Sequence, residues 1–467
     1  MPATHLWAVD SVGRVHTLST TGARWQELPY SGVDLKRVSA LPSCAWGIGS
    51  NHRVYMYLAQ SDVPVRVPEV TYENQRWNPK EGFCTRLLPT DRPAWSSKDG
   101  LEARFKDGIH LPSSGWQWEG HWYLEDNVDG QLLGPEGWSY CVDFPFTYTP
   151  QKHWNSMVRR RKWIRYRRYV ATERWAEASS IESIHKDPVL EPIVDVSVGG
   201  VEIPGGNREH IAVWVVSVLG RVLFREGVTR LCPEGTRWVP VQVPENLEVN
   251  QVSVGRTGLT WAVAWSGNAL VRLGVSRHNY MGTEWTEVGA PDSDEKLLQV
   301  AVGQNMVWAV GRNGTVWFRK GIRSDDLGCR ASVTGSGWIK MIGTMAMISV
   351  GPNDQVWGIT RDDRRLCLRT GVTLEETSGR EWKEIAAPVG SGPSRTSSVA
   401  SLTSLASLKS ATPSHVALSE RGGAGDDLSV NVTPERRRMS RPESTHSRSS
   451  SGEGGGVLRQ VSAGTLL

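Results

Sequence analysis

The chain has 467 residues, and its 53 basic and 49 acidic side chains leave a formal net charge of +4. So balanced a charge excludes a protein that binds polyanions over its whole surface, and we expect no nucleic-acid partner. The length allows more than one hydrophobic core. Tryptophan is unusually frequent, since 22 Trp stand against 6 Phe and 10 Tyr. This inverted aromatic usage indicates an internal repeat.

The six cysteines lie far apart and form no CxxC pair, which favours reduced thiols in a cytosolic protein. The N-terminal sequence MPATHLWAVDSVGR has no basic region followed by an apolar core, so we expect no signal peptide. The longest apolar run, near residues 211–219, is about half the length that a membrane-spanning helix needs. Any membrane contact is therefore expected to be peripheral.

Two similar units open the chain. Trp7 is followed six residues later by Gly13, and Trp46 is followed six residues later by His52. Beyond each turn, apolar residues alternate as they do in a half-buried strand. This order of strand, tight turn and strand predicts a β-hairpin in each unit. Residues 1–58 are therefore predicted to form the first two units of the repeat.

A segment with its own signature follows the first two units. It contains NQRWNPKEGF from Asn74, GWQWEGHWYLEDNVDGQLLGPEGWSYCVDF from Gly115 and KHWNSMVRRRKWIRYRRYV from Lys152. The run Arg159–Arg168 alternates arginines with Trp163 and Tyr166, which predicts a strand whose guanidinium groups stack on indole rings. A nuclear localisation signal and a patch for anionic lipids are the alternatives for this run.

Trp154 lies in the sequence PQKHWNSM, between two strand-like stretches. In such a loop, fewer neighbouring side chains are available to bury an indole ring. An exposed indole can enter a bilayer interface, or attract the quaternary ammonium group of a choline lipid. Trp154, with His153 and Asn155 beside it, is therefore the candidate lipid-binding site. The alternative is that Trp154 is one more ring in the arginine and tryptophan stack.

Four more repeat units follow the inserted segment, because Trp214, Trp261, Trp308 and Trp357 are separated by 47, 47 and 49 residues. Each Trp is preceded by a strand such as Val252-Ser253-Val254-Gly255, and a second Trp opens a fourth strand. Units of this length with four strands are typical of β-propeller blades. We predict an all-β, six-bladed propeller formed by residues 1–58 and 190–388, with residues 59–176 inserted between the second and third blades.

The last part of the chain has a different composition. From Ser391 onward, 77 residues contain 18 Ser and no Trp, Tyr or Phe. Such a segment buries too little apolar surface to offset the entropy that ordering it would cost. Residues 389–467 are therefore predicted to be a disordered, Ser-rich tail.

Catalytic and metal-binding patterns are not found. The sequence has no GxSxG, no P-loop, no HExxH and no GxGxxG after a strand, and its eleven His are scattered. His121 and His153 have no Cys or acidic partners at ligand spacing. We predict that the protein is not an enzyme and holds neither a metal nor a cofactor.

The repeat frames VSVG, VWAV and GxVxxRxGVT resemble tectonin repeats over nearly all of residues 1–58 and 190–388. The inserted segment resembles a dysferlin (DysF) domain, a family marked by Arg side chains stacked on Trp rings. The resemblance implies that one set of residues has this structural role: Trp77, Trp116, Trp118, Trp122, Trp138, Trp163, Arg159, Arg161 and Arg165.

A tectonin propeller with a DysF insertion is similar to proteins of the autophagy and lysosome pathway. This resemblance implies a cytoplasmic protein recruited to lysosome and autophagosome membranes, whose DysF insertion binds sphingomyelin or another choline lipid on damaged lysosomes. It also implies that the chain is a short isoform or fragment of a longer protein. The longer relatives engage the autophagy conjugation machinery, for which we find no site in this chain. The alternative function is a lectin-like or purely protein-binding propeller scaffold.

Overall fold

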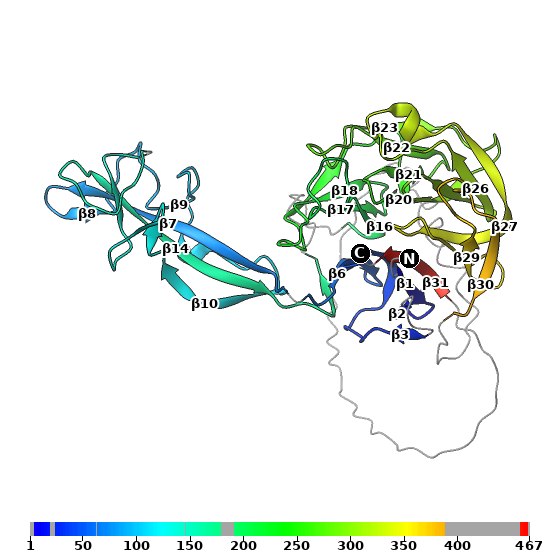
Figure 1. Cartoon of the computed structure of the whole chain (residues 1–467), viewed down its shortest axis with the longest axis horizontal. Helices are drawn as coiled ribbons and strands as arrows, with labels where there is room; N and C mark the ends of the chain where they lie inside the picture. The colour runs from blue at the N-terminus through cyan, green and yellow to red at the C-terminus, as the bar shows by residue number, and fades with distance from the viewer. Residues whose placement is uncertain are drawn as a thin grey trace, which may run out of the picture. The chain divides into compact units, whose positions relative to one another are not determined.

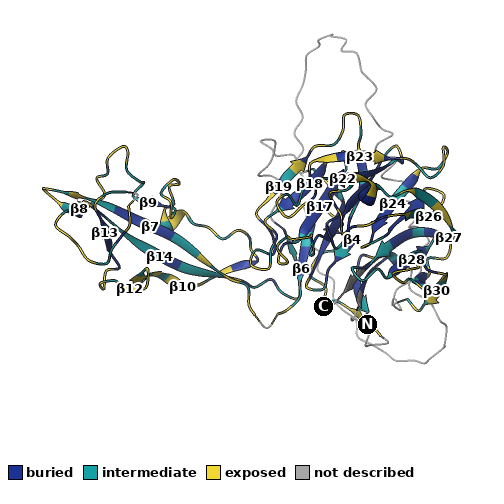
Figure 2. Cartoon of the chain, turned by 45° about the horizontal axis from the view of Figure 1, so that its top comes forward, coloured by how far each residue is buried: buried dark blue, intermediate teal, exposed yellow. Residues whose placement is uncertain are grey.

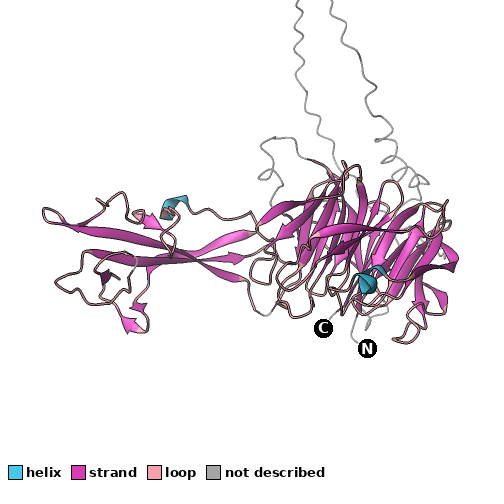
Figure 3. Ribbon diagram, turned by 90° about the horizontal axis from the view of Figure 1, so that it is seen from above, coloured by secondary structure: helices cyan, strands magenta, loops and turns pink. Residues whose placement is uncertain are grey.

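The computed structural model describes residues 4–18, 24–61, 63–144, 146–178, 191–387 and 458–465, which fall in one compact unit. In these ranges the regular structure is almost entirely β-strand (Figure 3), apart from helix α1 (Arg330–Thr334) and a 3-10 turn, η1 (Lys106–Gly108). The all-β class is therefore confirmed. No helix within these ranges has the length and apolar character to cross a membrane.

Four groups of four antiparallel strands follow chain order around a common centre (Figure 1). The first two comprise β16 (Ile193–Gly199), β17 (Ala212–Ser217), β18 (Val222–Glu226) and β19 (Arg237–Val241), then β20 (Val249–Val254), β21 (Thr260–Ala264), β22 (Ala269–Leu273) and β23 (Glu284–Val288). The next contains β24 (Leu297–Val302), β25 (Val307–Gly311) and β26 (Thr315–Lys320), and the last contains β28 (Val356–Thr360), β29 (Leu366–Thr370) and β30 (Glu381–Ile385). The long strand β27 (Gly337–Val350) is the fourth strand of each of these last two groups, because its first half pairs with β26 and its second half pairs with β28.

The inserted segment lies inside a blade rather than between two blades. The sheet has the order β15 (Trp175–Glu177), β6 (Val54–Leu58), β5 (Cys44–Gly49) and β4 (Leu35–Ala40). Its outer strand β15 therefore comes after the insertion, and the predicted position and boundary of the insertion are wrong. The reason is packing, since the Trp175 ring lies 5.6 Å from Tyr57 and 6.3 Å from Trp7. Glu173 N–H also donates to Leu58 O at 2.9 Å, which brings the two ends of the insertion together.

The sheet nearest the N-terminus is completed by the far end of the sequence. It has the order β3 (Trp25–Glu27), β2 (Val15–Leu18), β1 (Thr4–Asp10) and β31 (Leu458–Thr465). The prediction of a disordered tail over 389–467 is therefore wrong for β31, while residues 389–457 lie outside the described part of the chain. Strand β31 is ordered because it is paired along β1 and because Leu458 is buried in the core.

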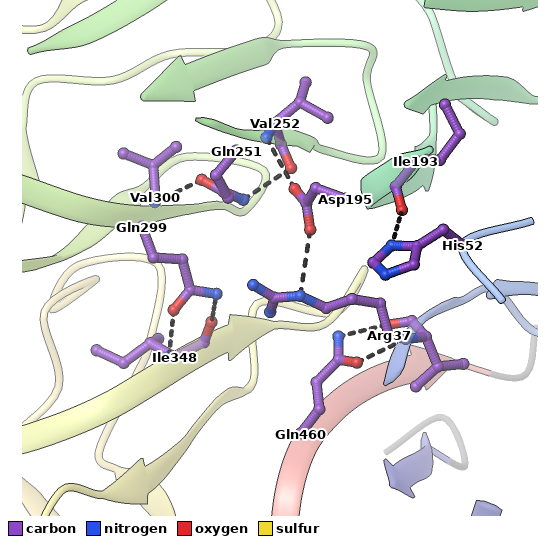
Figure 4. Close-up of polar contacts among 11 residues, drawn as sticks. Arg37, His52, Ile193, Asp195, Gln251, Val252, Gln299, Val300, Ile348 and Gln460 are labelled. Atoms are coloured by element: carbon purple, nitrogen blue, oxygen red, sulfur yellow. Dashed lines mark hydrogen bonds and ion pairs between the residues drawn. The ribbon is translucent and has the colours of Figure 1, made fainter. Parts of the chain in front are cut away.

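Six strands surround a central cavity of about 80 Å³: β31, β4, β16, β20, β24 and the second half of β27. Serine hydroxyls bond each of several inner strands to the next one. The bonded pairs are Ser462 to Ala40 N–H, Ser39 to Val198 N–H, Ser197 to Val254 N–H and Ser253 to Val302 N–H, each at 3.0 Å. Longer side chains reach across in the same way (Figure 4). Gln460, for example, bonds both the N–H and the C=O of Val38, at 2.6 and 2.7 Å.

The repeated tryptophans pack between sheets. Trp46, Trp214, Trp261 and Trp308 have no exposed surface, and β17, which carries Trp214, is dark blue in Figure 2. Each meets, edge to face, the outer Trp of another unit: Trp238, Trp285, Trp338 and Trp382, at 6.4, 6.0, 6.1 and 5.9 Å. The turn glycines Gly220, Gly267 and Gly314 have φ of 76°, 96° and 88°, the left-handed region in which glycine is unstrained.

The insertion forms a sheet of its own, built on two long strands, β7 (Arg66–Asn78) and β14 (Val158–Tyr169). Its order is β10 (Trp116–Leu124), β14, β7 and β8 (Gly82–Cys84), with β13 (Ser139–Cys141) on β14 and β9 (Trp95–Ser96) on β7. Two short strands, β11 (Asn127–Val128) and β12 (Gln131–Leu132), form a separate hairpin. Strands β7 and β14 run side by side (Figure 1).

Candidate functional site

One face of β14 carries a series of cations that cover aromatic rings. Successive odd-numbered residues of a strand point to the same face, and here they are mostly arginines. The guanidinium carbons lie over the rings as follows: Arg167 on Trp116 at 4.1 Å, Arg165 on Trp118 at 4.4 Å, Arg161 on Trp138 at 4.4 Å and on Trp163 at 5.1 Å, and Arg159 on Trp138 at 3.9 Å. We call this series the Arg/Trp ladder.

Carboxylates of β7 hold the ladder in place. Arg161 Nε lies 2.6 Å from Glu73 Oε2, which also accepts the Trp163 indole N–H at 3.0 Å. Arg167 Nε lies 2.7 Å from Glu69 Oε1. These ion pairs are largely shielded from water, and their geometry limits the rotamers of Arg161 and Arg167. The ladder is therefore a rigid support.

Two tryptophans expected in the stack lie outside it. Among the described residues, neither Trp77 nor Trp122 has a cation over its ring. Trp122 lies 6.1 Å from Trp118 in a tilted arrangement, whereas the side chain of Trp77 is 39% exposed at the end of β7. The other seven expected residues, Trp116, Trp118, Trp138, Trp163, Arg159, Arg161 and Arg165, all take part in the contacts above.

Trp154 lies on a tight turn just before β14. Ser156 N–H donates to His153 O at 3.1 Å, and His153 N–H donates to the buried Ser156 hydroxyl at 3.0 Å. The turn therefore presents Trp154 and Asn155 at its two central positions. The Trp154 side chain is 95% exposed, the neighbouring His153 is exposed and Asn155 is half-buried. A ring so exposed does not fit the alternative in which Trp154 belongs to the stack.

The other end of the insertion is joined to the propeller. Trp116 and Tyr169 belong to the same buried cluster as Trp238 of β19, and the Ser113 hydroxyl donates to Glu234 Oε1 at 2.7 Å. Burial raises the pKa of the Glu234 carboxyl above its usual range. These contacts fix the base of the insertion, while Trp154 lies at the opposite end of β14.

The polar groups around the central cavity are used within the fold. Asp195 Oδ2 accepts the Val252 N–H at 2.9 Å, and Asp195 Oδ1 lies 3.6 Å from Arg37 Nε (Figure 4). Burial raises the pKa of Asp195 to about 6, although the charge of Arg37 and the Val252 hydrogen bond act in the opposite direction. No group of three metal-ligating side chains is found among the described residues.

Sequence reasoning missed a second set of arginines. Arg225, Arg272, Arg319 and Arg369 occupy the same position in four units and lie 5.1–5.3 Å from the outer Trp rings. Each donates to a backbone carbonyl of the segment just before its outer strand, as Arg272 does to Met281 at 2.9 Å. The signal was the Arg of the GxVxxRxG frame. Sequence reasoning also missed Gln460 and Ser462, although the sequence Val461-Ser462-Ala463 repeats Val38-Ser39-Ala40.

Comparison with protein families gives three matches along the chain. A Tectonin domain model matches residues 247–394, a Propeller model matches residues 212–241, and a model described as an integral peroxisomal membrane peroxin matches residues 49–165. Among solved structures, human WBSCR16 matches with 10% identity and a TM-score of 0.38 over 82% of this chain and 78% of that chain. That likeness is too distant to bear on the fold.

Two relatives match over most of the chain. The tectonin beta-propeller repeat-containing protein of Drosophila melanogaster is 47% identical over 86% of this chain and 30% of its own length. The human tectonin beta-propeller repeat-containing protein 1 is 50% identical over 83% of this chain and 32% of its own length. The chain thus spans about a third of the length of these relatives. It is homologous, over most of its own length, to the tectonin β-propeller repeat-containing proteins.

Proposed function

We propose that this chain is a peripheral membrane-recognition and tethering protein, in which the insertion binds sphingomyelin or another choline lipid and the propeller serves as the platform. One observation carries the proposal, namely the 95% exposure of Trp154 at the corner of a turn. An indole ring suits the membrane interface because it is apolar and its N–H still reaches water or headgroups. Its face also attracts the quaternary ammonium group of choline.

The turn that carries Trp154, and the strand β14 that follows it, favour this role. The turn is closed by two hydrogen bonds through Ser156, and the strand that follows carries the Arg/Trp ladder. A turn whose backbone is already fixed loses little conformational entropy when the indole that it carries binds. The family model described as a membrane peroxin, which covers residues 49–165, is further support for a membrane role of the insertion.

The resemblance to tectonin proteins with a DysF insertion extends the proposal to the autophagy and lysosome pathway. The chain would be cytoplasmic and would be recruited to lysosome or autophagosome membranes. Damage that exposes luminal sphingomyelin to the cytosol would create the binding surface. Any tie to the autophagy conjugation machinery belongs to the longer relatives, since the described residues offer no segment that we can assign to it.

The experiment is flotation of the chain with vesicles that contain or lack sphingomyelin. We expect Trp154→Ala to lower vesicle binding by about five- to thirtyfold, since one interfacial indole contributes on the order of 1–2 kcal/mol. The melting temperature should stay the same, because the ring is 95% exposed. Leu132→Ala is the matched control, since Leu132 is 79% exposed on β12 of the same insertion.

A Trp154→Ala chain that floats like the unmodified one would refute the assignment. If the unmodified chain does not float, the scaffold alternative replaces the proposal.

A further inference from the structure

We propose that the lipid-contacting surface continues from Trp154 onto the end of the β7–β14 sheet, where Trp77, Phe83 and Met157 rest against the headgroup region of the bilayer. We call these three residues the end face. The inference rests on the proposed function and adds to it a second contact, which sets how the insertion is seated on the membrane. It also gives Trp77 a different role from the stacking that the sequence suggested.

The end face is adjacent to the Trp154 turn. Trp77 lies opposite Phe83 in the β7–β8 pairing, and Trp77 N–H donates to Met157 O at 2.8 Å. Met157 follows Trp154 by three residues and comes directly after Ser156, which closes the turn. The three residues and the Trp154 turn therefore belong to the same end of the sheet, where the end of β7 lies between β8 and the start of β14.

Two of the three end-face residues, Trp77 and Met157, differ from the ladder in that they are uncovered, whereas Phe83 is half-buried beneath two cations. Within the ladder, Trp116 and Trp138 lie under guanidinium groups and are only 2% and 5% exposed. Trp77 has no such cover in the described part of the chain and is 39% exposed, and Met157 is 41% exposed. An uncovered apolar surface beside a fully exposed indole is unfavourable in water and marks a contact site.

Charges around the end face fit a phospholipid surface. Lys152 Nζ lies 5.3 Å from the Phe83 ring centroid and the Arg159 guanidinium carbon lies 4.8 Å from it. Sphingomyelin and phosphatidylcholine both carry a phosphate beside the choline group. With Trp154 inserted, these two cations would lie close to the phosphates while Trp77 and Met157 meet the interface.

The convex shape of the site favours a bilayer over a protein partner. Trp154 projects from the corner of a tight turn, so a protein partner would need a pocket made for one indole ring. Lipids move around an inserted ring and need no preformed pocket. We therefore assign the end face to a choline-lipid bilayer.

The test compares Trp77→Ala, Trp77→Phe and Met157→Ala with Leu132→Ala in flotation with vesicles that contain sphingomyelin. We expect Trp77→Ala and Met157→Ala to weaken binding by about tenfold and about threefold, and Trp77→Phe to retain most of it, because it keeps an apolar ring. Melting temperatures show whether each variant is folded. If Trp77→Ala unfolds the insertion, the Met157→Ala variant tests the end face instead. Weaker binding by Met157→Ala supports the end face, and unchanged binding overturns it.

The outcomes separate this inference from the proposed function. If Trp154→Ala loses binding while Met157→Ala and both Trp77 variants bind like the unmodified chain, the end face is wrong and the lipid-binding turn stands. If Trp154→Ala also binds normally, the proposed function fails together with the inference.

Discussion

Asp195 is a carboxylate held between two inner strands of the propeller, where it is almost entirely buried. Its pKa is raised to about 6 by burial, against the pull of Arg37. A group whose pKa is higher in the folded state than in the unfolded state stabilises the fold when it is protonated. Its contribution is therefore complete below about pH 4 and is lost as the pH rises through about 6.

This reasoning predicts a pH-dependent effect of Asp195→Asn. The amide oxygen still accepts the Val252 N–H, but the variant does not titrate. Relative to the unmodified chain, it should gain about 3 kcal/mol in unfolding free energy between pH 4 and pH 7, from a pKa shift of about two units. Melting temperatures across this range measure the difference. Two melting profiles that stay parallel would contradict the raised pKa.

Single residues also show what could be read from the sequence. The loop context of Trp154 predicted an exposed ring, because a turn between two strands offers little to cover it. The resemblance to a DysF domain placed Trp77 in the stack, but no cation lies over its ring among the described residues. Whether a strand residue faces a cation depends on which side chains the neighbouring strands bring to that face. That pairing is set by register, and the one-dimensional pattern does not contain it.

Among the elements, β14 is the one on which the insertion depends. Each of its odd-numbered arginines covers a ring. Two of them, Arg161 and Arg167, also pair with a carboxylate of β7. Arg161 joins both kinds of contact, since it lies over Trp138 and Trp163 and pairs with the largely buried Glu73.

Arg161→Met should therefore destabilise the insertion by about 3 kcal/mol, because the Glu73 charge would be left shielded from water with only the Trp163 N–H as its partner. The control is Arg86→Met, whose ion pair with Glu81 is 72% and 41% exposed and should contribute no more than about 1 kcal/mol. Hydrogen exchange of the β7 and β14 amides would measure both. Equal protection in the two variants would show that the ladder is not what holds these strands.

The positions of β15 and β31 show where the predictions of whole elements failed. The repeat period located the inner and central strands, because their frames recur along the chain. Strand β15 follows an insertion of more than a hundred residues, and the regular spacing of the repeats does not continue across such a gap. Strand β31 follows a long Ser-rich stretch whose composition dominated the interpretation, although Val461-Ser462-Ala463 carries the repeat frame.

At the scale of the whole molecule, the propeller is closed by a strand from the far end of the sequence. Strand β31 pairs with β1, and its Gln460 and Ser462 side chains bond the backbone of β4. Strand β31 therefore contributes to two sheets, one through its backbone and the other through its side chains.

A chain that lacks residues 458–465 should melt at a lower temperature and aggregate, because β1 is left with an unpaired edge and Val38 and Ala40 lose buried hydrogen bonds. A synthetic peptide of these eight residues should raise the melting temperature again as its concentration increases. The same peptide with Gln460→Ala and Ser462→Ala should act only weakly. An unchanged melting temperature after the deletion would contradict the closure.

The closure also sets an order of events during synthesis. Gln460 bonds a residue that precedes it by 422 positions, so the ribosome must translate nearly all of these residues before the ring can shut. Until then the sheet that contains β1 is incomplete, and its open edge can pair with other chains. Contacts this distant in sequence also slow folding. Chaperones that shield β1 during translation would therefore matter most for this part of the protein.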